Sequence, residues 1–258
     1  MLKLKIDINC DLGESFGALK IGNDAKVMPH ITSANIACGF HSGDPMTIAQ
    51  TVKLAKKHKV AVGAHPGFPD LVGFGRREMQ LAPEEAENYT LYQVGAVYGF
   101  AKAEGLNLQH VKPHGAMYNM AAEDETLSSA IVKAIQKLDD ELIVFAPPRS
   151  ALAKIATRAN LRVALEFFAD RAYNPDGSLV SRRQKGAIVH DARKVVQRAV
   201  TLVKEGTVQT VDDTTLNMGK VHTICVHGDT SNAVKLAESL KKGLTRARVS
   251  VEPVGRFL

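Results

Sequence analysis

The sequence has no apolar run long enough to cross a bilayer, and it has only three cysteines. Because a spanning helix needs about 20 mostly apolar residues in succession, a membrane protein is not expected. The opening residues, MLKLKIDINCDLGES, lack the apolar centre of an export signal and alternate as a strand does. Cys10, Cys38 and Cys225 are odd in number and far apart, which favours free thiols in a reducing cytoplasm over a disulfide framework.

A strong charge excess is absent from most of the chain. The net charge is +6, but residues 181–258 hold 14 Lys and Arg against 7 Asp and Glu. A basic segment can bind nucleic acid, yet no RNP-like, zinc-finger or helix-turn-helix signature accompanies it. Many of these charges fall on the polar faces of expected helices, so we interpret them as a solvated surface and expect no nucleic-acid partner.

Several catalytic motifs are also missing. The sequence contains no G-x-x-x-x-G-K-[ST] phosphate loop and no G-x-S-x-G nucleophile turn. Its one near match to G-x-G-x-x-G, the stretch GFGRR, lacks the third glycine. There is no low-complexity linker and no break in composition, so residues 1–258 are expected to form a single domain.

What the sequence does contain is an alternation of short apolar runs with amphipathic segments. Asp44 followed by Pro45 predicts the start of a helix, and Gly105, Gly206 and Gly243 fall where helices stop or fray. Seven or eight β–α units in succession predict an α/β fold with a parallel sheet, closed or nearly closed into a barrel, with an open doubly wound sheet as the alternative. The expected strands are Leu4–Cys10, Ile31–Cys38, Val60–Ala64, Leu108–Lys112, Leu142–Ala146, Val163–Phe168, His222–Val226 and Val249–Val254.

Polar residues collect directly after these strands, where parallel α/β folds carry their chemistry. We therefore expect one pocket at the carboxyl ends of the strands. The segment Gly63–Arg77, GAHPGFPDLVGFGRR, would form one wall, with glycines that permit close approach or unusual dihedrals. The irregular segment Asp170–Ile188 is a second candidate wall. The polar residues after the strands are Asn9, Asp11, Glu14, His41, Asp44, His65, Asp70, Arg76, Arg77, Lys112, His114, Asn119, Glu166, Asp170, Arg171, His227 and Asp229.

Some of these signals have simpler explanations. Asp44 is first a helix cap, and the three cysteines are interpreted as buried thiols rather than nucleophiles. His110 and His114 have the spacing of a helical metal pair, but on a strand residues i and i+4 lie about 13 Å apart, so joint chelation is rejected. Lys112 is harder to dismiss, because a lysine inside an apolar strand is costly unless it is paired or functional.

Long motifs carry a resemblance to a known family. IDINCDLGESFG, ITSANIACGFHSGDP, GAHPGFPDLVGFGRR, VKPHGAMYN, FADRAYNPDG and CVHGD occur in order, and together they closely resemble the LamB/YcsF family of bacterial 5-oxoprolinase A subunits. The resemblance implies a distorted or incomplete TIM-like β/α barrel of seven parallel strands, similar to polysaccharide deacetylases. It also implies hydrolysis of 5-oxoproline to glutamate, coupled to ATP with magnesium and carried out with B and C subunits.

The implied reaction needs a base, donors for a developing oxyanion and cations for phosphate. Whether a metal is bound stays open, as do two alternative functions, a free-standing metal-dependent deacetylase or hydrolase and a carbohydrate- or nucleotide-binding protein. The expected catalytic residues are Asp11, His41, His65, Lys112, His114 and Asp229. The expected substrate- or phosphate-binding residues are Asn9, Glu14, Asp70, Arg76, Glu166, Asp170, Arg171 and His227.

Overall fold

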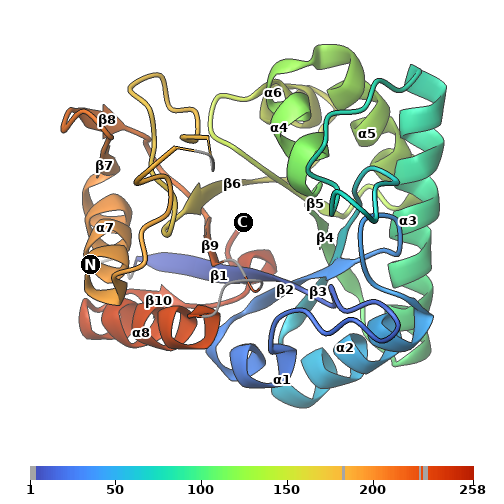
Figure 1. Ribbon diagram of the computed structural model, residues 1–258, viewed down its shortest axis with the longest axis horizontal. Helices are drawn as coiled ribbons and strands as arrows, with labels where there is room; N and C mark the ends of the chain where they lie inside the picture. Colours follow the sequence, from blue (N-terminus) through green and yellow to red (C-terminus); the bar gives the residue numbers. More distant parts are fainter. Residues whose placement is uncertain (1–3, 182–183, 227, 229–231) are drawn as a thin grey trace.

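The strands of the computed structural model close into a barrel (Figure 1). The structure describes residues 4–181, 184–226, 228 and 232–258. Seven parallel strands follow one another around the ring, and β9 pairs with both β6 and β1 to close it, which confirms the predicted barrel. The barrel strands are β1 (Lys5–Leu12), β2 (Ser33–Ala37), β3 (Ala61–His65), β4 (Leu108–Val111), β5 (Ile143–Ala146), β6 (Val163–Phe168) and β9 (Thr223–Val226).

Helices surround the ring on its outside (Figure 1). As predicted, Asp44 caps one of them by accepting a hydrogen bond from the backbone of Thr47, with Pro45 at the first helical position. Among the described residues, no helix is both long enough and apolar enough to span a bilayer. The α-helices are α1 (Asp24–Val27), α2 (Pro45–His58), α3 (Pro83–Ala103), α4 (Gly115–Glu123), α5 (Glu125–Leu138), α6 (Ala151–Arg158), α7 (Ala192–Glu205) and α8 (Ala233–Arg246); the short 3-10 helices are η1 (Met28–His30) and η2 (Val254–Arg256).

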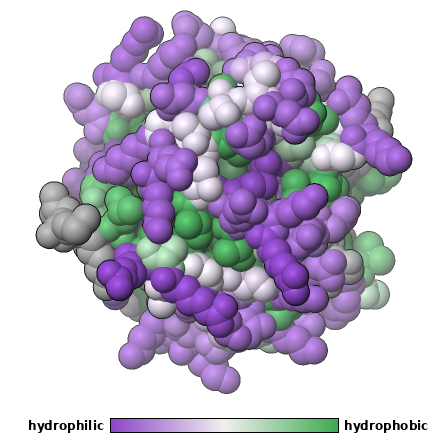
Figure 2. Space-filling model, turned by 90° about the vertical axis from the view of Figure 1, so that its left-hand side faces the viewer, coloured by the Kyte–Doolittle hydropathy of each residue, from purple (hydrophilic) through white to green (hydrophobic). Residues whose placement is uncertain are grey.

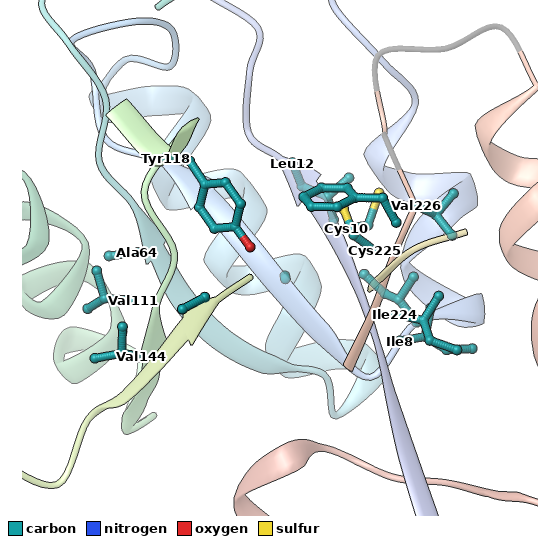
Figure 3. Packing of buried hydrophobic residues seen from close by; sticks show 14 of the residues in the cluster. Ile8, Cys10, Leu12, Ala64, Val111, Tyr118, Val144, Ile224, Cys225 and Val226 are labelled. Carbon is teal, nitrogen blue, oxygen red and sulfur yellow. The ribbon is translucent and has the colours of Figure 1, made fainter. Parts of the chain in front are cut away.

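The barrel strands are buried on both faces, as parallel sheets covered by helices are. Every residue of β2, β5 and β9 is buried. Figure 3 shows Ile8 and Ile224 packed together on β1 and β9, where these strands close the ring. Because burying each such side chain contributes roughly 1.5–3 kcal/mol, this closing seam is also a hydrophobic interface.

The predicted strand Val249–Val254 is not an eighth member of the ring. Only β10 (Ser250–Val251) forms there, and it pairs with the first residues of β1, ahead of the pairing with β9. Val254 then packs against Ile143 at the start of β5, which places this segment at the amino-terminal end of the barrel. A small antiparallel hairpin, β7 (Thr207–Gln209) with β8 (Thr215–Asn217), lies outside the ring and was not predicted.

Glycine has a different role in each of the helices α7 and α8. Gly206 ends α7 in the left-handed conformation, with φ of 73°, as predicted. Gly243 lies in the last turn of α8, which continues to Arg246, so the helix itself stops three residues later. A Cβ on Gly243 would lie 2.2 Å from a methyl group of Val196 in α7. The absence of a side chain therefore lets α7 and α8 pack closely.

Gly63 on β3 is required for a similar reason, and we expect Gly63→Ala to destabilise the fold. Its Cβ would lie 2.0 Å from Nε2 of His110 on the neighbouring strand. Overpacking of this kind costs about 1–3 kcal/mol, which corresponds to a melting temperature lower by roughly 3–10 °C, measured by thermal denaturation. Gly99→Ala is the matched control, because nothing lies within 4 Å of its Cβ and it sits in α3, where alanine is the better helix former. Equal melting temperatures for Gly63→Ala and the wild type would contradict the prediction.

Candidate active site

A buried ammonium group lies at the carboxyl-terminal end of the barrel. Lys112 directly follows β4 and is 2% exposed. Its Nζ lies 2.9 Å from Oε1 of Glu166 on β6 and 3.1 Å from Oδ1 of Asp11 on β1. It also donates to Oδ1 of Asn9 at 3.2 Å and to Sγ of Cys225 at 3.1 Å. Three strands that are distant in sequence, β1, β6 and β9, therefore contribute partners to one lysine.

The carboxylates keep this lysine charged. Burial by itself would lower the pKa of Lys112, but Asp11 and Glu166 more than compensate, and they raise the pKa well above its ordinary value. The ammonium also lies 5.2 Å from the centre of the Phe168 ring. A fixed positive charge of this kind can neutralise a developing oxyanion or a phosphate oxygen.

Two members of this network were not predicted. Asn35 on β2 donates from Nδ2 to Asn9 at 2.7 Å and to Asp11 at 2.8 Å. Tyr118 on α4 donates its hydroxyl to Oε2 of Glu166 at 2.6 Å, and Figure 3 shows this ring pointing into the barrel. The sequence did carry a signal for Asn35, because it is an amide inside the apolar stretch SANIA. Asn119, which was predicted to face the pocket and lies beside Tyr118, is exposed.

Three histidines lie beside Asp11. The rings of His41 and His114 stack with centroids 3.8 Å apart, and the ring of His65 meets that of His114 edge-on at 4.8 Å. His65 Nε2 lies 3.5 Å from Oδ1 of Asp11. Burial, followed by repulsion from the neighbouring imidazoles, lowers the pKa of His41 and of His114 well below the ordinary value, so both rings are neutral at pH 7.

This cluster has the donor set of a cation site. Glu14, His41, His65 and His114 are all buried, and one ligand atom from each lies within 4.8 Å of the others. Glu14 Oε1 is 3.9 Å from Nδ1 of His114. Three imidazoles with one carboxylate fit a divalent transition metal better than they fit magnesium.

The glycine-rich loop within Gly63–Arg77 packs closely against these histidines. A Cβ on Gly67 would lie 2.6 Å from Nδ1 of His41, and one on Gly75 would lie 2.7 Å from Cβ of His41. Gln93 of α3 holds the loop by bonding both the backbone N–H and the carbonyl of Gly67 at 2.9 Å. The close approach expected of these glycines is thus to the imidazole rings.

Three other charged residues of this loop make contacts within the loop itself. Asp70 pairs with Arg77, which is the main reason that the pKa of Asp70 falls to about 2. The guanidinium of Arg76 lies 4.9 Å from the centre of the Phe74 ring. The pairing of Asp70 with Arg77 closes the turn, since Asp70 also accepts from the N–H of Gly73 at 2.9 Å.

The irregular segment after β6 is folded on itself. Arg171 donates to the carbonyl of Val180 at 2.6 Å and to that of Ala187 at 3.3 Å. The backbone carbonyl of Asp170 accepts from the N–H of Val189 at 2.8 Å. Both Asp170 and Arg171 are buried at the end of the barrel strand. His227 and Asp229, which were expected to join the site, lie outside the described residues.

His110 is separate from the histidine cluster. Its Nε2 lies 2.7 Å from Oδ1 of Asn35, and its ring stacks on Phe145 at 4.1 Å. Only His114 of the H-x3-H pair belongs to the cation-type cluster found among the described residues. The three cysteines are free and buried, as predicted, and burial raises the pKa of each thiol, so none is set up as a nucleophile.

A separate groove of about 670 Å³ lies between α7 and α8, away from the lysine network. Figure 2 shows this side of the molecule, where hydrophilic side chains surround an apolar strip. The groove has an apolar floor with Val196 and Leu236 and a rim that carries the basic residues Arg193, Lys235, Lys242 and Arg246.

Comparisons with known proteins agree with the motifs. A protein of Pyrococcus horikoshii, named as the A subunit of 5-oxoprolinase, is 51% identical over 255 residues, which are 99% of this chain and 100% of that protein. A protein of Bacillus licheniformis with the same name is 50% identical over 96% of this chain and 98% of its own length. The crystal structure of a lactam utilization protein from Thermus thermophilus has a TM-score of 0.91 and 46% identity, over 96% of this chain and 99% of that one.

More distant structures share the fold alone. The catalytic domain of a peptidoglycan N-acetylglucosamine deacetylase from Eubacterium rectale has a TM-score of 0.52 and 11% identity, over 97% of this chain and 88% of that one. The predicted likeness to deacetylase folds is thereby confirmed. The family model described as LamB/YcsF matches residues 6–258 of this chain. With full-length relatives at about half identity, the chain belongs to the LamB/YcsF family.

Proposed function

We propose that this chain is the A subunit of a 5-oxoprolinase and that it carries the ring-opening site of that enzyme. The observation that supports this most is the buried ammonium of Lys112 held between Asp11 and Glu166, beside three imidazoles. The full-length relatives named as 5-oxoprolinase A subunits point to the same reaction.

The substrate explains why such a site is needed. The five-membered lactam of 5-oxoproline is resonance-stabilised, so its hydrolysis to glutamate requires coupling to ATP. Transfer of the terminal phosphoryl group of ATP to the lactam oxygen releases ADP and makes the ring carbon electrophilic. Water then attacks that carbon, the ring C–N bond breaks as the nitrogen takes up a proton, and the phosphoryl group leaves as phosphate when a second water is consumed. This step needs a base for the water and a cation for the charge that builds on oxygen.

Asp11 and Lys112 have the positions for these two roles. Asp11 is 8% exposed, more than Glu14 at 4% and Glu166 at 1%, so it is the carboxylate of this network most open to an incoming molecule. It takes the proton of the attacking water, while Lys112 neutralises charge on the lactam or phosphate oxygen. Glu166, itself held by Tyr118, keeps Lys112 in place.

The assembled enzyme uses ATP and its magnesium ion. The B and C subunits are the partners of this chain, and the complex works in a reducing cytoplasm. The sequence has no phosphate-loop motif of its own. The basic rim of the groove between α7 and α8 suits docking of an acidic surface of a partner protein, because opposite charge guides association.

The purified chain alone is therefore expected to form no glutamate from 5-oxoproline, ATP and magnesium, whereas addition of B and C subunits restores equal amounts of glutamate and ADP. Both products are measured in the same reaction. In the complete mixture, Lys242→Glu combined with Arg246→Glu should weaken assembly, and Lys102→Glu, on α3, serves as its control.

Glutamate and ADP formed in equal amounts by the chain alone would contradict the proposal that it works as one subunit of a larger enzyme. A metal-dependent deacetylase is the second candidate, because the fold and the histidine cluster both suit it. Release of acetate from an N-acetylated sugar by the chain alone, with no coupled product in the complete mixture, would favour that function instead.

A further inference from the structure

The tautomers of two buried histidines follow from their carbonyl contacts. Nδ1 of His65 lies 2.6 Å from the backbone oxygen of Lys112, so Nδ1 carries the hydrogen. Nε2 of His114 lies 2.8 Å from the backbone oxygen of Phe74, so there Nε2 carries it. An imidazole with its hydrogen on one nitrogen has its lone pair on the other, which here is Nε2 of His65 and Nδ1 of His114.

These two lone pairs face each other. Nδ1 of His114 and Nε2 of His65 are 2.9 Å apart, a distance at which two acceptors repel unless a cation lies between or beside them. Asp11 and Glu14 add negative charge next to the same atoms, at 3.5 Å from His65 and 3.9 Å from His114. The missing partner of this pair is thus positively charged.

His41 gives an independent observation. It is fully buried, and neither of its ring nitrogens has a hydrogen-bond partner within the part of the chain that the structure describes. An imidazole buried without partners is costly, whereas the same nitrogens are good metal ligands. The glycines at positions 67 and 75 leave room for this ring against that of His114.

We propose that Glu14, His41, His65 and His114 bind one divalent transition-metal ion of the zinc class. Hydrogen bonds from the other ring nitrogen to a backbone carbonyl are the usual support of metal-binding histidines, and His65 and His114 both have one. Donors around a tetrahedral zinc ion lie about 3.4 Å apart for bonds near 2.1 Å. On binding, the widest pair, now up to 4.8 Å apart, therefore moves closer, the nitrogens of His65 and His114 move apart from 2.9 Å, and the His41 ring tilts out of its stack.

This inference goes beyond the proposed function, and it holds for either candidate activity. A bound ion would supply a Lewis acid beside Asp11 and Lys112. Asp11 remains outside the ligand set, since its Oδ1 accepts from both Lys112 and Asn35.

The test measures binding of metal by the chain and does not depend on enzyme activity. The chain is stripped with a chelator, dialysed, and titrated with zinc by calorimetry, with retained metal measured by mass spectrometry. One equivalent of zinc is expected to bind, whereas magnesium should not compete for the site. His41→Ala and Glu14→Gln should each weaken zinc binding at least tenfold, and His190→Ala, an exposed histidine outside the cluster, should leave it unchanged.

Circular dichroism checks that each variant is folded, and His41→Ala removes no described hydrogen bond. A cobalt(II) spectrum typical of four-coordinate nitrogen and oxygen ligation is expected for the wild type and not for His41→Ala. Failure of the stripped wild type to bind zinc would overturn the proposal and leave a shared proton between His65 and His114. Loss of zinc in Asp11→Asn with retention in Glu14→Gln would overturn the assigned ligand set.

Discussion

Replacing Lys112 with methionine is expected to abolish 5-oxoproline hydrolysis by the assembled enzyme, with kcat lower by at least about 10³-fold. Methionine keeps much of the length and apolar stem of lysine but removes the charge that lies 3.1 Å from Asp11 and 2.9 Å from Glu166. The reaction then has no fixed cation for the oxygen that becomes negative. The measurement is steady-state glutamate formation with B and C subunits present.

Stability must be separated from chemistry in this variant. Breaking a buried ion pair leaves carboxylates unpaired and costs about 3–5 kcal/mol. Adding Glu166→Gln to Lys112→Met removes one of those charges and should recover part of the lost stability without recovering activity. Lys56→Met, at an exposed lysine 3.5 Å from Glu104, is the matched control and should retain wild-type activity. Activity that returns with stability in the double variant would show that Lys112 acts only through the fold.

The second large effect is a loss of stability in mild acid through His110. Burial, with a further contribution from Lys112, lowers the pKa of His110 from its ordinary value near 6.5 to about 3. Between these values the unfolded chain binds a proton that the folded chain does not, so stability falls as pH falls below about 6.5. The loss is about 1.4 kcal/mol per pH unit, or roughly 3 kcal/mol by pH 4.5.

Urea unfolding from pH 7 to pH 4.5, with a chelator present, measures this loss. His110→Gln is the comparison, because its amide can still donate to Oδ1 of Asn35 as the imidazole does at 2.7 Å. The variant is expected to be less stable at pH 7, but its stability should depend on pH less steeply by about one proton. Parallel curves for the two proteins would mean that His110 binds its proton equally well in both states.

The strands of the barrel could be predicted because parallel strands covered by helices are continuous apolar runs, as Val60–Ala64 is. Apolar runs could not show whether the sheet closes into a barrel or stays open. It depends on the pairing of β1 with β9, such as Asn9 with Cys225, and this pairing leaves no local signal. The hairpin β7–β8 was missed because its strands have three residues each and are partly exposed.

The site was predictable as far as strand ends could be located. That approach found Asp11, His65 and His114, which the structure brings together. It did not find Tyr118, which reaches Glu166 from one helical turn beyond His114, because side-chain direction depends on where α4 begins. It also could not tell that Asp70 turns to Arg77, since that pairing is set by the fold of the loop itself.

The seam between β1 and β9 also dictates the order of events during synthesis. Residues 5–12 leave the ribosome early, but the strand that completes their pairing is more than two hundred residues away, at Thr223–Val226. At roughly 5–20 residues per second, the nascent β1 waits tens of seconds with one edge unpaired. Throughout that interval β1 lacks β9 beside it, so Asn9 has no Cys225 to pair with, and the edge is open to pairing with other chains. This protein is therefore expected to need chaperone protection until translation is almost complete, and truncations before β9 should aggregate rather than yield a smaller working domain.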